Sequence, residues 1–166
     1  TVGIEIEPEW ANMHPDTIVG NALCLPFADG VFGAVATSCT YANRMADAHE
    51  AKDKSERNTY RHKLGRKLHE DNSGAMQWGP KYRDFHTRAW TEAIRVIRPG
   101  GAFVLNCKNH IRAGSVIRVT EWHIEELCRL GLQLVKEQQI EHRGNRQGQN
   151  GDLRVPYESV VLLRKP

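Results

Sequence analysis

Apolar segments of strand length alternate with helical segments along this chain, and two strand segments follow each other at its end. Such alternation is typical of α/β sheets, in which helices connect parallel strands. The two terminal segments flank a polar stretch that contains Asn150-Gly151, a strong signal of an antiparallel hairpin. The sequence therefore predicts an α/β sheet with a C-terminal antiparallel hairpin. We expect strands at residues 1–7, 17–22, 33–38, 102–107, 132–141 and 153–163, and helices at residues 85–98 and 120–130, the latter capped by Thr120.

The composition is that of an ordinary folded domain, with 166 residues, of which 40% are hydrophobic and 26% charged. Domains typically contain ~100–200 residues, so we expect a single domain over residues 1–166. No apolar run approaches the ~18–20 residues that span a bilayer, and no signal peptide opens the chain. We therefore expect a cytoplasmic protein that makes no membrane contact.

The four cysteines are far apart in the sequence. They form no CxxC pair, and the eight histidines form no HExxH or HxH motif. Zinc sites usually contain such short spacings, and a disulfide framework is atypical at this length. We therefore expect no metal site, and we interpret Cys24, Cys39, Cys107 and Cys128 as buried free thiols.

A polar insertion at about residues 42–84 interrupts the pattern. It contains ten Lys or Arg and seven Asp or Glu, and this excess equals the net charge of +3 of the whole chain. Tyr60, Trp78 and Tyr82 lie among the basic residues, and aromatic rings can stack on unpaired bases while cations bind phosphates. The insertion therefore suggests a nucleic-acid contact. A solvated surface excursion is the alternative, because the seven acidic residues dilute the positive charge.

Three segments together resemble the Rossmann-like S-adenosylmethionine-dependent methyltransferases. They are GIEIEPEW (residues 3–10), GNALCLPFADGVFGAVATSCTY (residues 20–41) and EAIRVIRPGGAFVLN (residues 92–106). Within these enzymes the sequence is most similar to phage and bacterial DNA amino-methyltransferases. The resemblance implies a class I methyltransferase sheet, S-adenosylmethionine as cofactor, and methyl transfer to the exocyclic amine of a DNA base, adenine or cytosine.

The resemblance assigns the cofactor to the first segment and the residues after it. Glu5 aligns with the acid that binds the ribose hydroxyls, and Glu7 is the alternative if the strand register slips by two residues. Trp10 would lie along the adenine ring or simply belong to the core. Asn21 would accept a hydrogen bond from the adenine amino group, and Ala22 would offer backbone groups. The alternative is that the acids are solvated and Asn21 belongs to a strand-end turn.

Ser38-Cys39-Thr40-Tyr41 resembles the amino-methyltransferase motif of a polar residue, two prolines and an aromatic residue. The resemblance implies that the Ser38 side chain and the Cys39 carbonyl accept hydrogen bonds from the target amine, while Tyr41 stacks on the extruded base. Cys39 and Thr40 occupy the two proline positions of that motif. An ordinary strand-to-loop connection and a Cys39 nucleophile are the alternatives.

Asn43 and Arg44 directly follow this motif, and Arg61, Lys63 and Arg66 add positive charge to the insertion. We expect these five residues to contact DNA. Asn106 and His110, at the end of a later strand, could line the same site, because ligands of open α/β sheets bind at the carboxyl ends of strands.

The family's glycine-rich cofactor loop and central strand should precede residue 1, and the printed sequence contains neither. Such a unit takes ~30 residues. We therefore expect an N-terminally incomplete sheet whose inner edges an upstream segment or a second chain would complete. The alternatives to a DNA methyltransferase are a degenerate, non-catalytic nucleic-acid-binding module, or a methyltransferase that acts on RNA or a small molecule.

Overall fold

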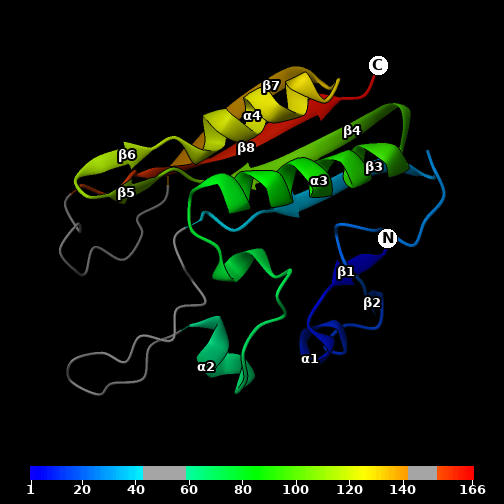
Figure 1. Ribbon diagram of the computed structural model, residues 1–166. Helices are drawn as coiled ribbons and strands as arrows, with labels where there is room; N and C mark the ends of the chain where they lie inside the picture. Colours follow the sequence, from blue (N-terminus) through cyan, green and yellow to red (C-terminus); the bar gives the residue numbers. More distant parts are fainter. Residues whose placement is uncertain (43–58, 142–152) are drawn as a thin grey trace. The chain divides into compact units, whose positions relative to one another are not determined.

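The computed structural model describes residues 1–42, 59–141 and 153–166 (Figure 1). These residues form two compact units. The first comprises residues 1–26 and 42–92, and the second comprises residues 27–41 and 93–166. The described part of the predicted insertion belongs to the first unit. No helix in the described part of the chain is both long and apolar enough to cross a membrane.

The first unit contains two short parallel strands. β1 (Gly3–Glu5) pairs with β2 (Thr17–Val19), and the one-turn helix α1 (Pro8–Ala11) lies between them in the chain. Proline starts this helix because its fixed φ suits the first helical turn and its missing N–H is not needed there.

Two further short helices of this unit fall in the predicted insertion. They are α2 (Tyr60–Leu64) and the 3₁₀-helix η1 (Ser73–Ala75). The Thr59 side chain accepts a hydrogen bond from the His62 N–H at the start of α2, which makes it an N-cap. Gly65 ends α2 in the left-handed conformation that terminates many helices. The described part of the insertion is thus partly helical.

The long helix α3 (Pro80–Val96) begins five residues before the predicted start, and proline again occupies its first turn. It runs from the first unit into the second. Residues spaced by three and four positions form its buried face, as in an amphipathic helix. The buried residues are Tyr82, His86, Ala89, Trp90, Ala93 and Val96.

A four-stranded mixed sheet forms most of the second unit, in the order β3-β4-β8-β7 (Figure 1). The predicted α/β sheet and its C-terminal antiparallel hairpin are confirmed. Strand β3 pairs in parallel with β4, and β8 pairs antiparallel with both β4 and β7. The strands are β3 (Phe32–Ser38), β4 (Ile97–Cys107), β7 (Gln133–Glu141) and β8 (Tyr157–Arg164).

Strand β4 begins at Ile97, five residues before the predicted start at residue 102. Pro99-Gly100-Gly101 is a sequence typical of a turn, but it forms an irregularity inside the ladder. Gly100 has φ 74°, a conformation that favours glycine. A Cβ atom at Gly101 would lie 2.9 Å from the backbone oxygen of Gly33 and 2.8 Å from that of Arg98, so only glycine fits there.

Helix α4 (Val119–Arg129) follows a short hairpin that the sequence did not predict, β5 (His110–Arg112) and β6 (Ser115–Ile117). The expected Thr120 cap is wrong, because Thr120 lies inside the first turn. Asn109 caps the helix instead: its side-chain oxygen accepts from the Thr120 N–H at 2.8 Å, and its amide donates to Glu121. This cap comes from eleven residues upstream, so a local motif could not reveal it.

The core of the second unit lies on one face of its sheet. Alternate residues of β4 are fully buried, and their cross-strand neighbours on β8 are buried with them. Helix α4 lies along β7 and β8 (Figure 1) and contributes Val119, His123 and Leu127 to the buried set. The sheet residues of this core are Phe103, Leu105, Cys107, Ser159, Val161 and Leu163.

The described strands form separate hydrogen-bonded ladders. β1 pairs only with β2, and β3 pairs only with β4, within the part of the chain that the structure describes. Both β1 and β3 therefore present an edge along which a further strand could hydrogen-bond.

Candidate functional site

Ser38 and Tyr41, the polar and aromatic residues of the predicted motif, are in contact at the end of β3. Ser38 is the last residue of the strand, and a hydrogen bond joins its side chain to the Tyr41 phenol. Its neighbour across the parallel ladder is Asn106, near the end of β4. The carboxyl ends of the two strands thus bring these side chains to the sheet edge where ligands bind in α/β folds.

The Tyr41 phenol is held in its neutral form. Burial raises its pKa above the usual value of 10, the hydrogen bond from Ser38 opposes this, and the negative charge of Glu158 adds to the rise. A half-buried neutral ring with a fixed hydroxyl can stack on a flat ligand.

Glu158 is a neighbour of this site that sequence reasoning missed. Its carboxylate accepts from the Asn106 amide at 3.3 Å and lies 4.0 Å from the Lys108 ammonium group. Glu158 comes from β8, and the antiparallel pairing of β8 with β4 brings it here. No local motif surrounds it, so only knowledge of the strand register could have placed it at the site.

His110 lies at the same edge, as the sequence predicted. It hydrogen-bonds to the backbone of Tyr41, and burial, followed by the nearby charge of Arg112, lowers its pKa below the ordinary value of 6.5. The ring is therefore neutral at physiological pH. Its Nδ1 atom is buried and has no hydrogen-bond partner among the described residues, so a ligand atom could satisfy it.

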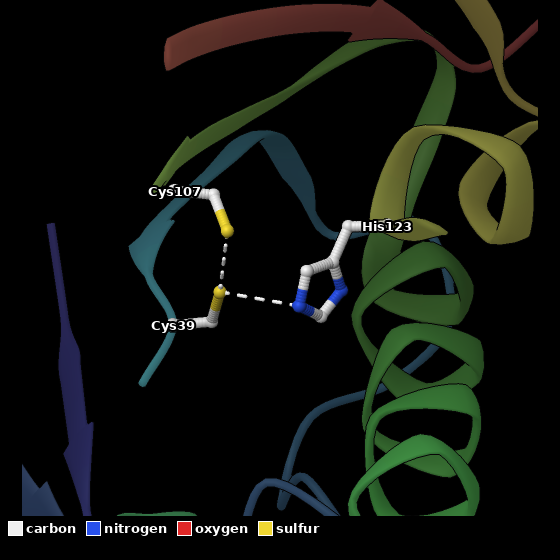
Figure 2. Close-up of side chains that lie close together, drawn as sticks. All are labelled: Cys39, Cys107 and His123. Carbon is white, nitrogen blue, oxygen red and sulfur yellow. Dashed lines mark hydrogen bonds between the residues drawn. The ribbon is translucent and has the colours of Figure 1, made fainter. Parts of the chain in front are cut away.

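The Cys39 side chain points away from this edge into the core of the second unit. Its sulfur lies 3.5 Å from that of Cys107 and 3.4 Å from Nε2 of His123 (Figure 2). The structure thus places a histidine beside the Cys39 sulfur, as activation of a cysteine nucleophile requires, but only 8% of Cys39 is exposed. The expectation of four buried thiols is half wrong, because Cys24 and Cys128 are exposed.

In the first unit, Glu5 ends strand β1 and is half-buried. Its Oε1 atom accepts from the Glu7 N–H at 2.9 Å. Its other oxygen makes no hydrogen bond within the described ranges, so it can accept one from a ligand. A carboxylate at the end of a strand is placed as the ribose-binding acid of nucleotide folds is.

Glu7, the alternative acid, is fully buried and engaged. Its Oε1 atom accepts from the His69 N–H and from the Asn72 amide, both at 2.8 Å, while Oε2 lies 2.9 Å from the Arg66 guanidinium. Burial opposes ionisation, but these hydrogen bonds and the Arg66 charge hold the pKa of Glu7 below its usual value. The side chain therefore ties the segment that follows α2 to the residues just after β1.

The remaining predicted cofactor residues lie in the same unit. Trp10 is half-buried and meets the Tyr60 ring edge-on, with 5.5 Å between ring centroids. Asn21 accepts from the Leu23 N–H and donates to Asp71 at 2.8 Å. Ala22 is exposed.

The predicted DNA-contacting residues differ in their surroundings. Arg61 and Lys63 are exposed on α2. Arg66 instead forms a two-pronged pair with Glu9, at 2.9 and 2.6 Å, in addition to its contact with Glu7. These carboxylates balance much of its charge. Asn43 and Arg44 lie outside the described residues.

Comparisons with known proteins bear on the fold. No protein-family profile and no curated protein matches the sequence, but solved structures do. A methyltransferase from Methanosarcina mazei, described as S-adenosylmethionine-dependent, has a TM-score of 0.59 at 12% identity, over 99% of this chain and 81% of that one. The chain has the Rossmann-like fold of class I methyltransferases.

Two further structures show the range of proteins with this fold. The cyclase SpnF has a TM-score of 0.58 at 14% identity, over 99% of this chain and 66% of that one. A protein named as a DNA modification methylase from Thermus thermophilus has a TM-score of 0.55 at 16% identity, over 89% of this chain and 51% of that one. The chain thus spans about half the length of the Thermus protein, and the fold alone does not choose a reaction.

Proposed function

We propose that this protein transfers a methyl group from S-adenosylmethionine to the exocyclic amine of adenine or cytosine in DNA. The observation that carries the proposal is the hydrogen-bonded pair of Ser38 and Tyr41 at the carboxyl end of β3. The methyltransferase fold and the Thermus protein named as a DNA modification methylase support it.

The chemistry explains why a polar acceptor and an aromatic ring suit this reaction. The lone pair of a base amine is delocalised into the ring, so the nitrogen is a poor nucleophile. Hydrogen bonds accepted from the amine by the Ser38 hydroxyl and the Cys39 carbonyl favour its rehybridisation, while Tyr41 holds the extruded base. The N–CH₃ bond forms as the S–CH₃ bond breaks, and the amine proton leaves to water.

The first unit offers residues that suit the cofactor. When bound, S-adenosylmethionine supplies a methyl group on a positively charged sulfur. The Glu5 oxygen that lacks a hydrogen bond among the described residues suits the ribose hydroxyls, whereas Glu7 is already engaged by three neighbouring groups. We assign the adenine ring to Trp10, Asn21 and Ala22.

Basic residues of the insertion are proposed to contact the DNA. The exposed cations Arg61 and Lys63 suit phosphate groups. We also assign Asn43 and Arg44, which directly follow the motif, to the DNA. Arg66 contributes less than these residues, because Glu7 and Glu9 balance its charge.

Analysis of the methylated product tests this function. The purified chain is incubated with DNA and S-adenosylmethionine, the DNA is digested to nucleosides, and methylated adenine and cytosine are measured by mass spectrometry. We expect one of the two to accumulate. The absence of both, while RNA or a small amine is methylated, would contradict the assignment of a DNA base.

Variants of Tyr41 and Ser38 then separate the roles of the two residues. Tyr41→Phe keeps the ring and should retain most of the turnover, whereas Tyr41→Ala should lose it. Ser38→Ala should lower kcat by about 10²–10³-fold, the usual cost of losing one oriented polar contact to the reacting group. Cofactor affinity should change little in all three, and the reverse pattern would refute these roles.

A further inference from the structure

Three soft metal-binding side chains meet in the core of the second unit. Cys39 follows β3, Cys107 ends β4, and His123 lies on α4, and all three point toward one another (Figure 2). Their ligand atoms lie within 4.8 Å of one another, with Cys39 Sγ 3.5 Å from Cys107 Sγ and 3.4 Å from His123 Nε2. We call this group the Cys₂His cluster.

Two of the three separations, both from Cys39, are close to those between the ligands of one metal ion. With Zn–S bonds of about 2.3 Å and a Zn–N bond of about 2.0 Å, tetrahedral angles place two sulfurs about 3.8 Å apart and a sulfur and a nitrogen about 3.5 Å apart. The two measured contacts of Cys39 differ from these values by a few tenths of an ångström or less. The third pair, Cys107 Sγ and the His123 ring, lies within 4.8 Å, and side-chain movements that bring these atoms closer would let all three hold one ion.

Charge and burial favour a divalent ion. Cys107 and His123 have no exposed surface and Cys39 is 8% exposed, and an uncompensated charge in such a place is costly. Two thiolates balance the charge of a divalent ion, and a neutral imidazole adds none. Thiolate and imidazole are also the ligands that zinc prefers in proteins.

We propose that Cys39, Cys107 and His123 bind a zinc ion that joins the ends of β3 and β4 to α4. Binding releases one proton from each thiol and leaves a neutral site, with no change in oxidation state. The sequence predicts no metal, because 68 residues separate the two cysteines and His123 is 84 residues from Cys39. Only the parallel pairing of β3 with β4 and the packing of α4 bring them together.

Titration of the reduced, metal-free full chain with Co²⁺, a spectroscopic substitute for zinc, tests the proposal. We expect a near-ultraviolet thiolate-to-cobalt absorption band that saturates at one ion per chain and disappears when Zn²⁺ is added. About two protons should be released for each ion bound. A chain that develops no such band would overturn the proposal.

Variants locate the site. Cys39→Ser, Cys107→Ser and His123→Gln should each weaken Co²⁺ binding by at least about 100-fold, since even outer-shell partners of metal ligands contribute about 10–100-fold. Cys24→Ser and Cys128→Ser are the matched controls, because these cysteines are exposed, and they should keep the band unchanged. Loss of the band in the controls alone would place the ion elsewhere and refute the site.

A second measurement covers the case in which a cluster variant does not fold. In the wild-type chain, Zn²⁺ should protect Cys39 and Cys107 from alkylation during brief partial unfolding, while Cys24 and Cys128 react as before. Equal labelling of all four cysteines with and without Zn²⁺ would also refute the proposal.

Discussion

At the scale of single residues, His86 shows how burial sets a charge state. It is 2% exposed on α3, and its Nδ1 atom donates to the Tyr82 carbonyl at 2.9 Å. Burial lowers the pKa of His86 to about 4, and the hydrogen bond to Tyr82 only partly opposes this. The imidazole is therefore neutral in the folded protein at physiological pH, and protonating it requires a charge in the core.

The pKa of His86 is lower in the folded chain than in the unfolded chain, and this difference predicts a loss of stability in mild acid. As the pH falls below about 6.5, the unfolded chain binds a proton at His86 before the folded chain does, so folding weakens until about pH 4. Urea unfolding should show wild type losing about 1.2 kcal/mol between pH 6 and pH 5, relative to His86→Phe. Between pH 7 and 8 the unfolding free energies of wild type and His86→Phe should change in parallel. A difference in unfolding free energy between the two proteins that does not depend on pH would contradict the lowered pKa of His86.

The sequence could predict a residue's environment only where neighbours along the chain decide it. Ser38 and Tyr41 belong to one local motif, and a hydrogen bond joins them; their roles toward a base stay a prediction. Glu158 and His123 gain their neighbours through strand pairing and helix packing. Because linear spacing carries no information about those contacts, neither residue stood out in the sequence.

At the scale of elements, the glycines in β4 explain a boundary that the sequence misplaced. Pro-Gly-Gly is typical of a turn, and the strand was expected to start after it. In the structure Gly100 takes a left-handed conformation within the ladder, and Gly101 lets the backbones of β3 and β4 approach closely. The positions of the strands were predictable from their apolar runs, but their ends depend on pairing.

The two glycines should respond differently to substitution. Gly101→Ala should cost about 1–3 kcal/mol of unfolding free energy, because its Cβ has no room beside the Gly33 backbone. Gly100 has open space around it, so Gly100→Asn should cost less, since asparagine tolerates left-handed φ. Gly101→Asn should not reduce the cost at position 101 in this way, because that cost comes from the missing room for a Cβ atom. Urea denaturation measures all three, and equal costs at both positions would contradict this account.

At the scale of the whole molecule, the order of strands and helices predicted the α/β sheet, and the order of three segments that resemble methyltransferases predicted the methyltransferase fold. That order is a property of the whole chain, so it survives the loss of individual motif residues such as the two prolines. The reaction does not follow in the same way, because this fold is shared by methyltransferases and by the cyclase SpnF. Function must therefore be tested at its sites, beginning with the cofactor.

Calorimetric titration of the chain with S-adenosylmethionine tests the central claim most directly. The titration is made with this chain and with a version extended upstream, and we predict binding of one molecule per chain in at least the longer version. Glu5→Gln should weaken it by about 10–100-fold, because hydrogen bonds to a charged group contribute about 1.5–3 kcal/mol. Glu9→Gln is the matched control: Glu9 pairs with Arg66 and is exposed, so this variant should bind as wild type does. Absence of binding, or binding that Glu5→Gln leaves unchanged, would contradict the account.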